Sequence, residues 1–257
     1  MVSLRNDPSL HPVLVAASGV IFDVDGVLLD APHSDAWRLA AAALCSRAGL
    51  PPLPSGRAWG LLYATRIAGR PRADGARALL WHLGIADRSG TMARELAATK
   101  NGLFLQLVGE GRVRRYEDAW ALASACHAHG MKCVLASSSR NAGILLSLLT
   151  PSEAALFDAD VSASTVRGKP APDLFLAAAQ SIGLPPSKCL VIEDAPSGIA
   201  AARAAHMAVI AVDRFGFPDV LLASGPDLCV ASLFSAAELV YERADVSERG
   251  RGLGCNR

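Results

Sequence analysis

The stretch 20–27 constrains the fold of this chain more than any other. Residues 20–22 are apolar and rich in β-branched side chains, which is typical of a buried strand. Asp23 and Asp25 follow, and because side chains at i and i+2 of an extended chain point the same way, both should face the end of the strand. Two like charges there repel each other unless a cation or a proton lies between them. Gly26 permits a tight turn whose N–H groups face an anion, but a strand ending in an acidic turn explains this stretch equally well.

Composition and charge bear on the class of protein. Of the 257 residues, 51% are hydrophobic and only 5% are aromatic, a composition that suits helices packed on a parallel sheet. The 25 basic and 24 acidic residues leave a net charge of +1. That balance does not favour nucleic acid or a membrane surface as a partner, so we expect neither.

The cysteines and the apolar N-terminal stretch indicate the compartment. The six cysteines form no CxxC pair and no Cys/His cluster with zinc-like spacing. Cys133 and Cys189 lie in apolar runs, and we expect reduced core residues, as in the cytosol. The apolar stretch 13–22 is too short to span a bilayer. Because Asp23 and Asp25 follow where a signal peptide would have small residues, we interpret 13–22 as a strand and expect a cytoplasmic protein. We also expect a monomer.

The order of predicted elements indicates an α/β fold with an insertion. Helical spacing of apolar residues dominates the block from about 33 to 112, over 36–44, 56–67, 74–83 and 90–108, and no convincing strand interrupts it. Strand-like runs follow at 131–136, 158–162, 189–192, 209–212 and 228–230, between helical patterns at 144–149, 172–182, 198–205 and 233–242. Strands that alternate with helices predict a Rossmann-like parallel sheet flanked by helices. We predict a core of residues 1–30 and 115–257 and an all-helical cap of residues 31–114, with a loose arm over 1–12 and a frayed tail from Arg243.

Polar and charged side chains follow several of these strands, where ligands of open parallel sheets bind. They are Asp23, Asp25, Ser137, Glu193 and Asp194, with Lys169 in the loop before a predicted helix. Singly, each has an ordinary explanation: acidic residues suit a helix start, a serine caps a helix, and a lysine before a proline is common in loops.

Together the same residues predict phosphate chemistry. Four carboxylates require a counter-charge, and a hard divalent cation such as Mg²⁺ prefers oxygen ligands. No histidine or cysteine accompanies them, which disfavours zinc. A hydroxyl, glycine-loop N–H groups, a lysine and a metal ion describe a phosphate site. A free carboxylate beside that site indicates phosphoryl transfer with an aspartate as the nucleophile.

From residue 19 to 212, these motifs and their order resemble the haloacid dehalogenase-like superfamily. The resemblance implies that Asp23 forms an aspartyl-phosphate and that Asp25 is the general acid/base. It implies that Mg²⁺ is held by the Asp23 carboxylate, the Asp25 backbone carbonyl and Asp194, with Glu193 bound directly or through water. Ser137 would bind phosphate oxygens, and Lys169 would neutralise charge on Asp23 and on the phosphoryl group.

The insertion point after the first motif resembles the subgroup with a helical cap, and further residues resemble β-phosphoglucomutase and its close relatives. The matching residues are His33, Arg72, Lys100, Asn101, Ser139, Arg140 and Asn141. The resemblance implies that Arg72 grips the phosphate that is not transferred and that the stretch 139–141 lies near it. Lys100 and Asn101 would face the cleft, and His33 would link Asp25 to cap closure, although the segment before His33 is about two residues shorter than the related pattern.

Three functions remain open from the sequence. We prefer a mutase that converts β-glucose 1-phosphate to glucose 6-phosphate through a bisphosphate. The first alternative is a phosphatase of small sugar phosphates, which shares every core residue. The second is a non-catalytic phosphate-binding protein. The expected partner is a small phosphorylated sugar.

Overall fold

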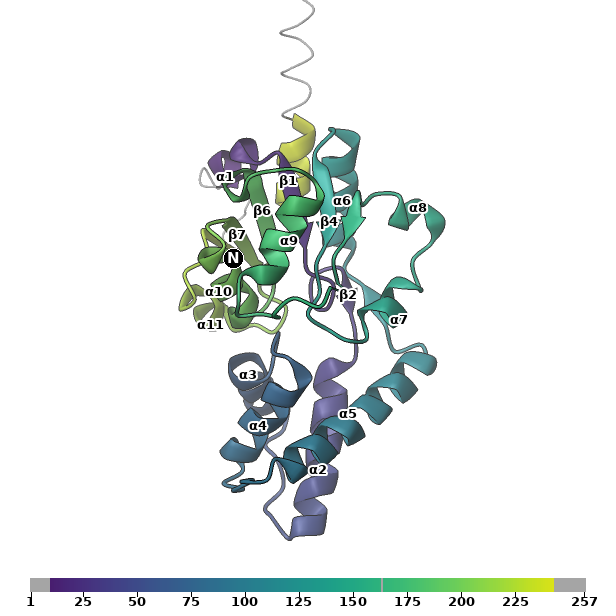
Figure 1. Cartoon of the computed structure of the whole chain (residues 1–257), viewed down its shortest axis with the longest axis vertical. Coiled ribbons are helices and arrows are strands. Elements are labelled where there is room, and N and C mark those ends of the chain that lie inside the picture. Colours follow the sequence, from purple (N-terminus) through teal and green to yellow (C-terminus); the bar gives the residue numbers. More distant parts are fainter. Residues whose placement is uncertain (1–9, 163, 243–257) are drawn as a thin grey trace, which may run out of the picture.

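The structure is a computed structural model that describes residues 10–162 and 164–242. Its centre is a six-stranded, wholly parallel sheet in the order β5-β4-β1-β6-β7-β8. The strands are β1 (Gly19–Phe22), β4 (Lys132–Leu135), β5 (Ala159–Asp160), β6 (Cys189–Glu193), β7 (Ala208–Val212) and β8 (Leu228–Val230). β1 lies between β4 and β6, so the loop after it is at the middle of the sheet edge (Figure 1).

Helices cover both faces of this sheet. Alternate residues of β1 point to opposite faces, so the strand contributes to two separate cores. Val20 and Phe22 pack in one core, while Ile21 packs in another. The first core includes residues of α6 (Glu117–Ala128), α7 (Ala142–Leu146) and a helix at 234–242. The second includes residues of α9 (Asp173–Ser181), α10 (Pro196–Ala204) and α11 (Pro218–Leu222). The predicted α/β class and Rossmann-like sheet are confirmed.

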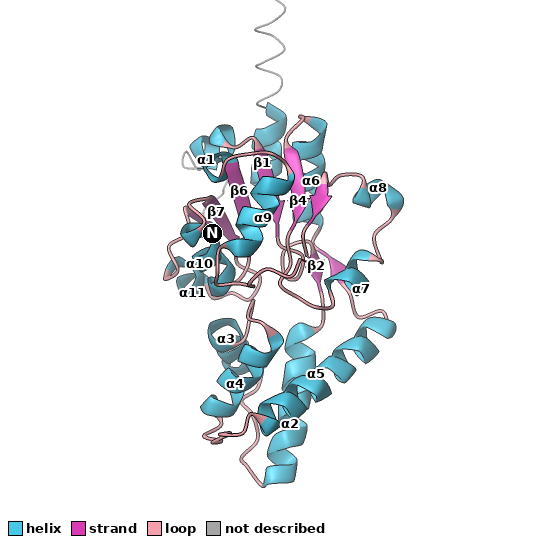
Figure 2. Cartoon of the chain, viewed as in Figure 1, coloured by secondary structure: helices cyan, strands magenta, loops and turns pink. Residues whose placement is uncertain are grey.

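The insertion is all-helical, as expected. It contains α2 (His33–Ala48), α3 (Gly56–Arg66), α4 (Arg72–His82) and α5 (Thr91–Gly109), and Figure 2 shows it as helices and loops only. A small core of its own includes Trp37, Trp59 and Leu79. Two short antiparallel strands that the sequence did not predict, β2 (Leu29–Asp30) and β3 (Arg114–Arg115), flank it. The domain boundaries at 31 and 114 remain a prediction.

The interpretation of 13–22 as one strand is partly wrong. The helix α1 (Leu10–Ala16) occupies its first part, and β1 begins only at Gly19. Leu14 and Ala17 are buried while Val15 is exposed, so the apolar pattern serves one face of a short helix before the strand. Four further elements were not predicted from the sequence: α6, α8 (Pro151–Ala154), α11 and a 3₁₀ turn at Pro186–Lys188.

Other expectations concern the termini, the cysteines and the membrane. The predicted arm over 1–12 lies mostly outside the described residues, as does the predicted tail from Arg243. Within the described part, Cys133 and Cys189 are buried free thiols, as expected. No helix in the described ranges is long and apolar enough to cross a membrane.

Candidate active site

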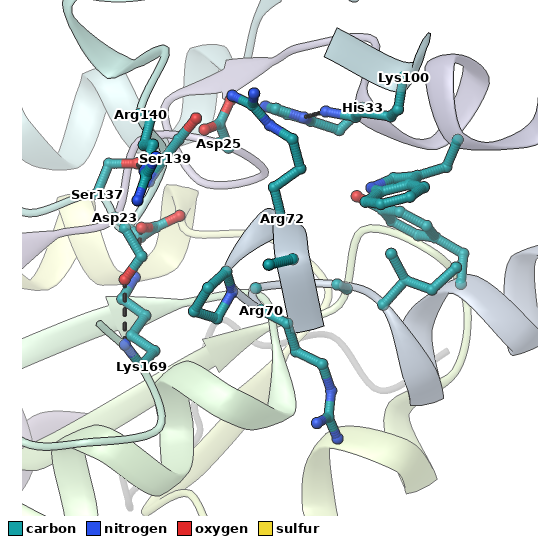
Figure 3. Close-up of a pocket in the computed structure, with 18 of the residues that line it drawn as sticks. Asp23, Asp25, His33, Arg70, Arg72, Lys100, Ser137, Ser139, Arg140 and Lys169 are labelled. Atoms are coloured by element: carbon teal, nitrogen blue, oxygen red, sulfur yellow. Dashed lines mark hydrogen bonds and ion pairs between the residues drawn. The ribbon is translucent and has the colours of Figure 1, made fainter. Parts of the chain in front are cut away.

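The candidate site lies at the carboxyl end of the sheet, where the insertion faces the core. Asp23 follows β1, Ser137 follows β4, and Glu193 ends β6 with Asp194 directly after it. All four side chains are buried, and so is Lys169 from the loop before α9. A pocket between core and cap is lined by Asp23, Ser137 and Lys169 from the core (Figure 3). Asp194 lines the same pocket. The structure therefore brings the predicted core residues together.

Lys169 is the counter-charge at the base of the site. Its ammonium group contacts the Asp23 carboxylate and lies 2.5 Å from Glu193 Oε1. Only 2% of the lysine side chain is exposed. Burial by itself would lower the pKa of Lys169, but attraction to Asp23 and Glu193 raises it. Lys169 is therefore a fixed positive charge between two carboxylates.

Three acidic side chains form a group that suits a divalent cation. One carboxylate oxygen from each of Asp23, Glu193 and Asp194 lies within 4.8 Å of the other two. Burial raises the pKa of Asp23 to about 7, with Glu193 and Asp25 adding to the rise and Lys169 opposing it. Burial, Glu193 and Asp23 likewise raise the pKa of Asp194. Such a group is short of positive charge, so its all-oxygen donor set fits Mg²⁺.

Glu193 is more fully occupied than the other two. Its Oε2 accepts hydrogen bonds from the backbone N–H groups of Asp194 (2.9 Å) and Ala195 (3.0 Å), and its Oε1 contacts Lys169. A Cβ at Gly198 would lie only 1.8 Å from Glu193 Oε1, so the following helix leaves space for this carboxylate only because residue 198 is glycine. Both carboxylate oxygens of Glu193 therefore already have partners within the protein.

We expect that Gly26→Ala will weaken this site strongly. Gly26 has φ +90°, and a Cβ there would lie 1.9 Å from Asp194 Oδ2. The substitution should therefore displace Asp194 and weaken Mg²⁺ binding by about 10-fold or more, in line with the effect of disturbing groups that orient metal ligands. Calorimetric titration of the protein with Mg²⁺ measures this. Gly102→Ala is the matched control, because nothing lies within 4 Å of a Cβ at that helical position.

The side chain of Asp25 lies outside the acidic group and contacts His33 instead. Asp25 Oδ1 is 3.1 Å from His33 Nε2, and Lys100 Nζ is 2.5 Å from His33 Nδ1. Burial opposes the charge on Asp25, but His33 and Lys100 outweigh it and hold its pKa below the usual value. Burial lowers the pKa of Lys100 to about 7, although Asp25 opposes the shift. The row Asp25–His33–Lys100 joins the core loop to α2 and α5 of the insertion.

His33 reaches Asp25 despite the short segment that precedes it. It is the first residue of α2, and its ring stacks on Phe104 with centroids 4.1 Å apart. Burial lowers the pKa of His33, and Asp25 opposes the shift. An imidazole in this position links the core to the insertion.

The serine loop after β4 carries its own hydrogen bonds. Ser137 Oγ accepts from the N–H of Ser139, and Ser139 Oγ accepts from the N–H of Asn141. Ser138, which the sequence analysis did not single out, accepts from the backbone N–H of Lys169 at 3.2 Å. The loop thus connects the lysine to the far end of the pocket.

At the far end, cap and core side chains meet. Arg72 Nη2 lies 3.4 Å from Asn141 Oδ1, and Asn141 Nδ2 donates to Asn101 Oδ1 at 2.9 Å. Arg140 lines the pocket from the core side. In Figure 3 the guanidinium of Arg72 points toward Asp25, whereas that of Arg70 points away. Sequence reasoning missed Tyr63, a buried cap residue that also lines the pocket.

Comparisons with known proteins bear on the class to which this chain belongs. The haloacid dehalogenase-like hydrolase family model matches residues 17–206. β-Phosphoglucomutase of Mycobacterium bovis is 32% identical over 76% of this chain and 81% of its own length. Fructose-1-phosphate phosphatase YqaB of Escherichia coli is 31% identical over 76% of this chain and 96% of its own length.

Two further matches bear on length and fold. The chain spans only 11% of the chloroplastic protein SUPPRESSOR OF QUENCHING 1 of Arabidopsis thaliana, with 40% identity over 115 residues. The crystal structure of an archaeal β-phosphoglucomutase from Pyrococcus has a TM-score of 0.65 and 25% identity, and the match covers 90% of this chain and 99% of that one.

The protein is an enzyme of the phosphotransferase and phosphatase class. It belongs to the haloacid dehalogenase-like hydrolase family. A purely phosphate-binding role is therefore set aside.

Proposed function

We propose that the enzyme transfers the phosphoryl group of a small sugar phosphate through Asp23, most specifically as a β-phosphoglucomutase. A carboxylate oxygen of Asp23 attacks phosphorus, and the bond between phosphorus and the sugar oxygen breaks. Asp25 donates a proton to that oxygen and later removes one from the hydroxyl group that accepts the phosphoryl group. Ser137 and Lys169 hold the phosphoryl oxygens during both steps, the transfer to Asp23 and the transfer from Asp23 to the acceptor.

Mg²⁺ is the proposed cofactor. Asp23, Asp194 and the backbone carbonyl of Asp25 would hold it, with Glu193 acting directly or through water. When bound, the ion would offset the repulsion between the Asp23 carboxylate and an anionic phosphate. The buried acidic group described above supports this assignment.

The observation that carries the mutase proposal is a pair of free cations at the far end of the pocket. Arg72 and Arg140 both line it, and within the described ranges neither forms an ion pair with a carboxylate. Burial and the nearby Arg140 charge lower the pKa of Arg72, so an anion between them would be favoured. A mutase needs such a second anion site, because its bisphosphate intermediate must turn over and rebind with either phosphate at Asp23.

A phosphatase is the second candidate, favoured by the similarity to YqaB over nearly that protein's whole length. One assay separates the two. The protein is incubated with Mg²⁺, β-glucose 1-phosphate and a trace of β-glucose 1,6-bisphosphate, and glucose 6-phosphate and free phosphate are followed together. Fast formation of glucose 6-phosphate with little free phosphate supports the mutase. Free phosphate alone overturns it in favour of the phosphatase.

For the mutase, Arg72→Ala should lower isomerisation far more than slow phosphate release. The loss of charge-assisted hydrogen bonds worth about 1.5–3 kcal/mol corresponds to roughly a 10- to 100-fold fall. Phosphate release from the enzyme needs no second anion site and should fall much less. Arg70→Ala is the matched control, since Arg70 is exposed and points away from Asp25. Equal losses in both reactions would count against a distal-phosphate role.

A further inference from the structure

A buried arginine that the proposed mechanism does not use lies directly behind the loop that carries Asp25. Arg214, two residues after β7, donates from Nε to the carbonyl of Gly26 (3.2 Å) and from Nη2 to the carbonyl of Val27 (3.3 Å). Its guanidinium lies 3.9 Å from the ring centroid of Tyr116. Only 7% of the Arg214 side chain is exposed.

The loop that carries Asp25 is held both by its own backbone hydrogen bonds and by contacts from other elements. The loop turns back on itself, because Gly26 N–H donates to Leu29 O and both Leu28 and Leu29 N–H groups donate to Val24 O. The next carbonyl, that of Leu28, is also held from outside, by the backbone N–H of Tyr116 and the indole N–H of Trp120. Three consecutive carbonyl groups behind Asp25 are thus anchored to other elements.

Asp118, at the start of α6, holds the guanidinium in place. Its two carboxylate oxygens each accept from Arg214 at 2.9 Å, in a bidentate pair. Asp118 Oδ2 also accepts from the N–H of Leu233 at 2.9 Å. Arginine suits this position because its planar fork can bind a carboxylate on one side while other N–H groups reach two carbonyl oxygens. A lysine offers a single point charge and cannot reproduce this geometry.

The backbone that carries Arg214 is itself restrained. The carboxylate of Asp213 accepts from the N–H groups of Phe215, Gly216 and Phe217, at 3.1, 2.9 and 3.1 Å. Phe215 then packs edge-on against Tyr63 of the cap, with ring centroids 5.5 Å apart. Arg214 therefore lies in a restrained turn that contacts both the loop carrying Asp25 and the cap.

We propose that Arg214, oriented by Asp118, is a positioning residue for Asp25. It holds the Gly26 and Val27 carbonyl groups, so that the Asp25 carboxylate stays at the distance from the leaving oxygen that proton transfer requires. The inference rests on the proposed function, in which Asp25 is the general acid/base. A purely structural ion pair would instead support the fold without any preference among reaction steps.

The leaving group of the substrate distinguishes these two roles. The leaving oxygen of a sugar phosphate needs a proton, whereas p-nitrophenolate departs as a stable anion. We would compare kcat/KM for p-nitrophenyl phosphate and for fructose 1-phosphate or β-glucose 1-phosphate, whichever sugar ester the unaltered enzyme dephosphorylates faster. Loss of positioning should lower kcat/KM by about 10- to 100-fold on the sugar ester, as small misplacements of reacting groups do, and by less than about 3-fold on p-nitrophenyl phosphate.

The variants are chosen to keep the protein folded. Arg214→Met alone leaves Asp118 as an unpaired buried charge, so the main variant is Arg214→Met with Asp118→Asn, which removes both charges. Arg214→Lys keeps the charge but loses the fork and should show the same selective loss. Arg203→Met is the matched control, since Arg203 is exposed and pairs with Asp227 at the surface. Equal falls on both esters, or full activity of Arg214→Lys, would overturn the proposal.

Amide hydrogen exchange provides a readout that needs no turnover. The double variant should exchange faster at residues 24–29, with β6 unchanged relative to the unaltered protein. Unchanged exchange at 24–29 overturns the inference. If the unaltered protein hydrolyses neither ester, the proposed function fails, and the exchange comparison still decides whether Arg214 holds this loop.

Discussion

Replacing Asp23 with Asn should lower turnover by at least about 10⁴-fold, the scale seen when a covalent nucleophile is removed. An amide oxygen is too weak a nucleophile to form the proposed aspartyl-phosphate. The substitution changes no volume in the buried site, and Lys169 keeps its contact with Glu193. Steady-state kinetics on any accepted sugar phosphate measures the effect. Asp219→Asn is the matched control at an exposed position, and it should retain full activity.

The same variant tests the electrostatics of the site through stability. In metal-free protein the pKa of Asp23 is raised to about 7, above its ordinary value of 3.8. The neutral carboxyl therefore favours the folded state at low pH, and that contribution is lost as the pH rises through 7. The unaltered protein therefore loses stability as the pH rises from 4 to about 7, whereas Asp23→Asn has no such group to ionise. The free energy of unfolding of Asp23→Asn, measured in urea, should increase relative to that of the unaltered protein over this pH range. Mg²⁺ should reverse this difference in stability, since the cation favours the ionised Asp23 carboxylate.

The activity of the same variant tests the catalytic role of Asp23. Retention of more than about a tenth of the activity by Asp23→Asn would contradict that role.

Lys169→Met should cost both activity and stability. The ammonium group of Lys169 is in direct contact with two buried carboxylates, and removing one partner of such a group costs about 3–5 kcal/mol. Methionine fills a similar volume, so the loss reflects charge rather than a cavity. Urea unfolding at pH 8 measures it, with Lys188→Met as the control because Lys188 is exposed.

The pH dependence of that loss has a definite sign. At pH 8 the Asp23 and Glu193 carboxylates are left without their counter-charge, and the deficit is largest. With Lys169 gone the pKa of Asp23 rises further, so the carboxyl is neutral at pH 5 and the deficit should shrink there. A deficit that is equal at both pH values would show that packing, not charge, explains the contribution of Lys169.

The core of the site was predictable because of one geometric rule. In a parallel sheet the carboxyl ends of all strands lie at one edge, so Asp23, Ser137 and Glu193 had to converge once their strands were recognised. The buried strands were recognisable from continuous apolar runs, and the helical insertion from the spacing of its apolar residues. The same reasoning failed at 13–22, where a helix and a strand follow each other within one apolar run.

Contacts between distant segments could not be predicted from patterns. Arg70 and Arg72 are two residues apart with identical side chains, and only the start of α4 decides that Arg72 points toward Asp25. Arg214 lies 188 residues from Gly26 and 96 residues from Asp118, and no local signal relates them. For His33, the family resemblance suggested a link to Asp25. Only the structure shows that the shorter preceding segment still places His33 Nε2 3.1 Å from Asp25 Oδ1.

The most direct test of phosphoryl transfer through Asp23 is to trap the phosphorylated enzyme. The protein is mixed with Mg²⁺ and radiolabelled sugar phosphate, quenched in acid during the first turnover and digested, and the labelled peptide is sequenced by mass spectrometry. We predict one phosphoryl group per chain, labile to hydroxylamine, on the peptide that contains Asp23, and none in Asp23→Asn. Turnover with no label on Asp23, or with the label on another residue, would contradict the proposed mechanism.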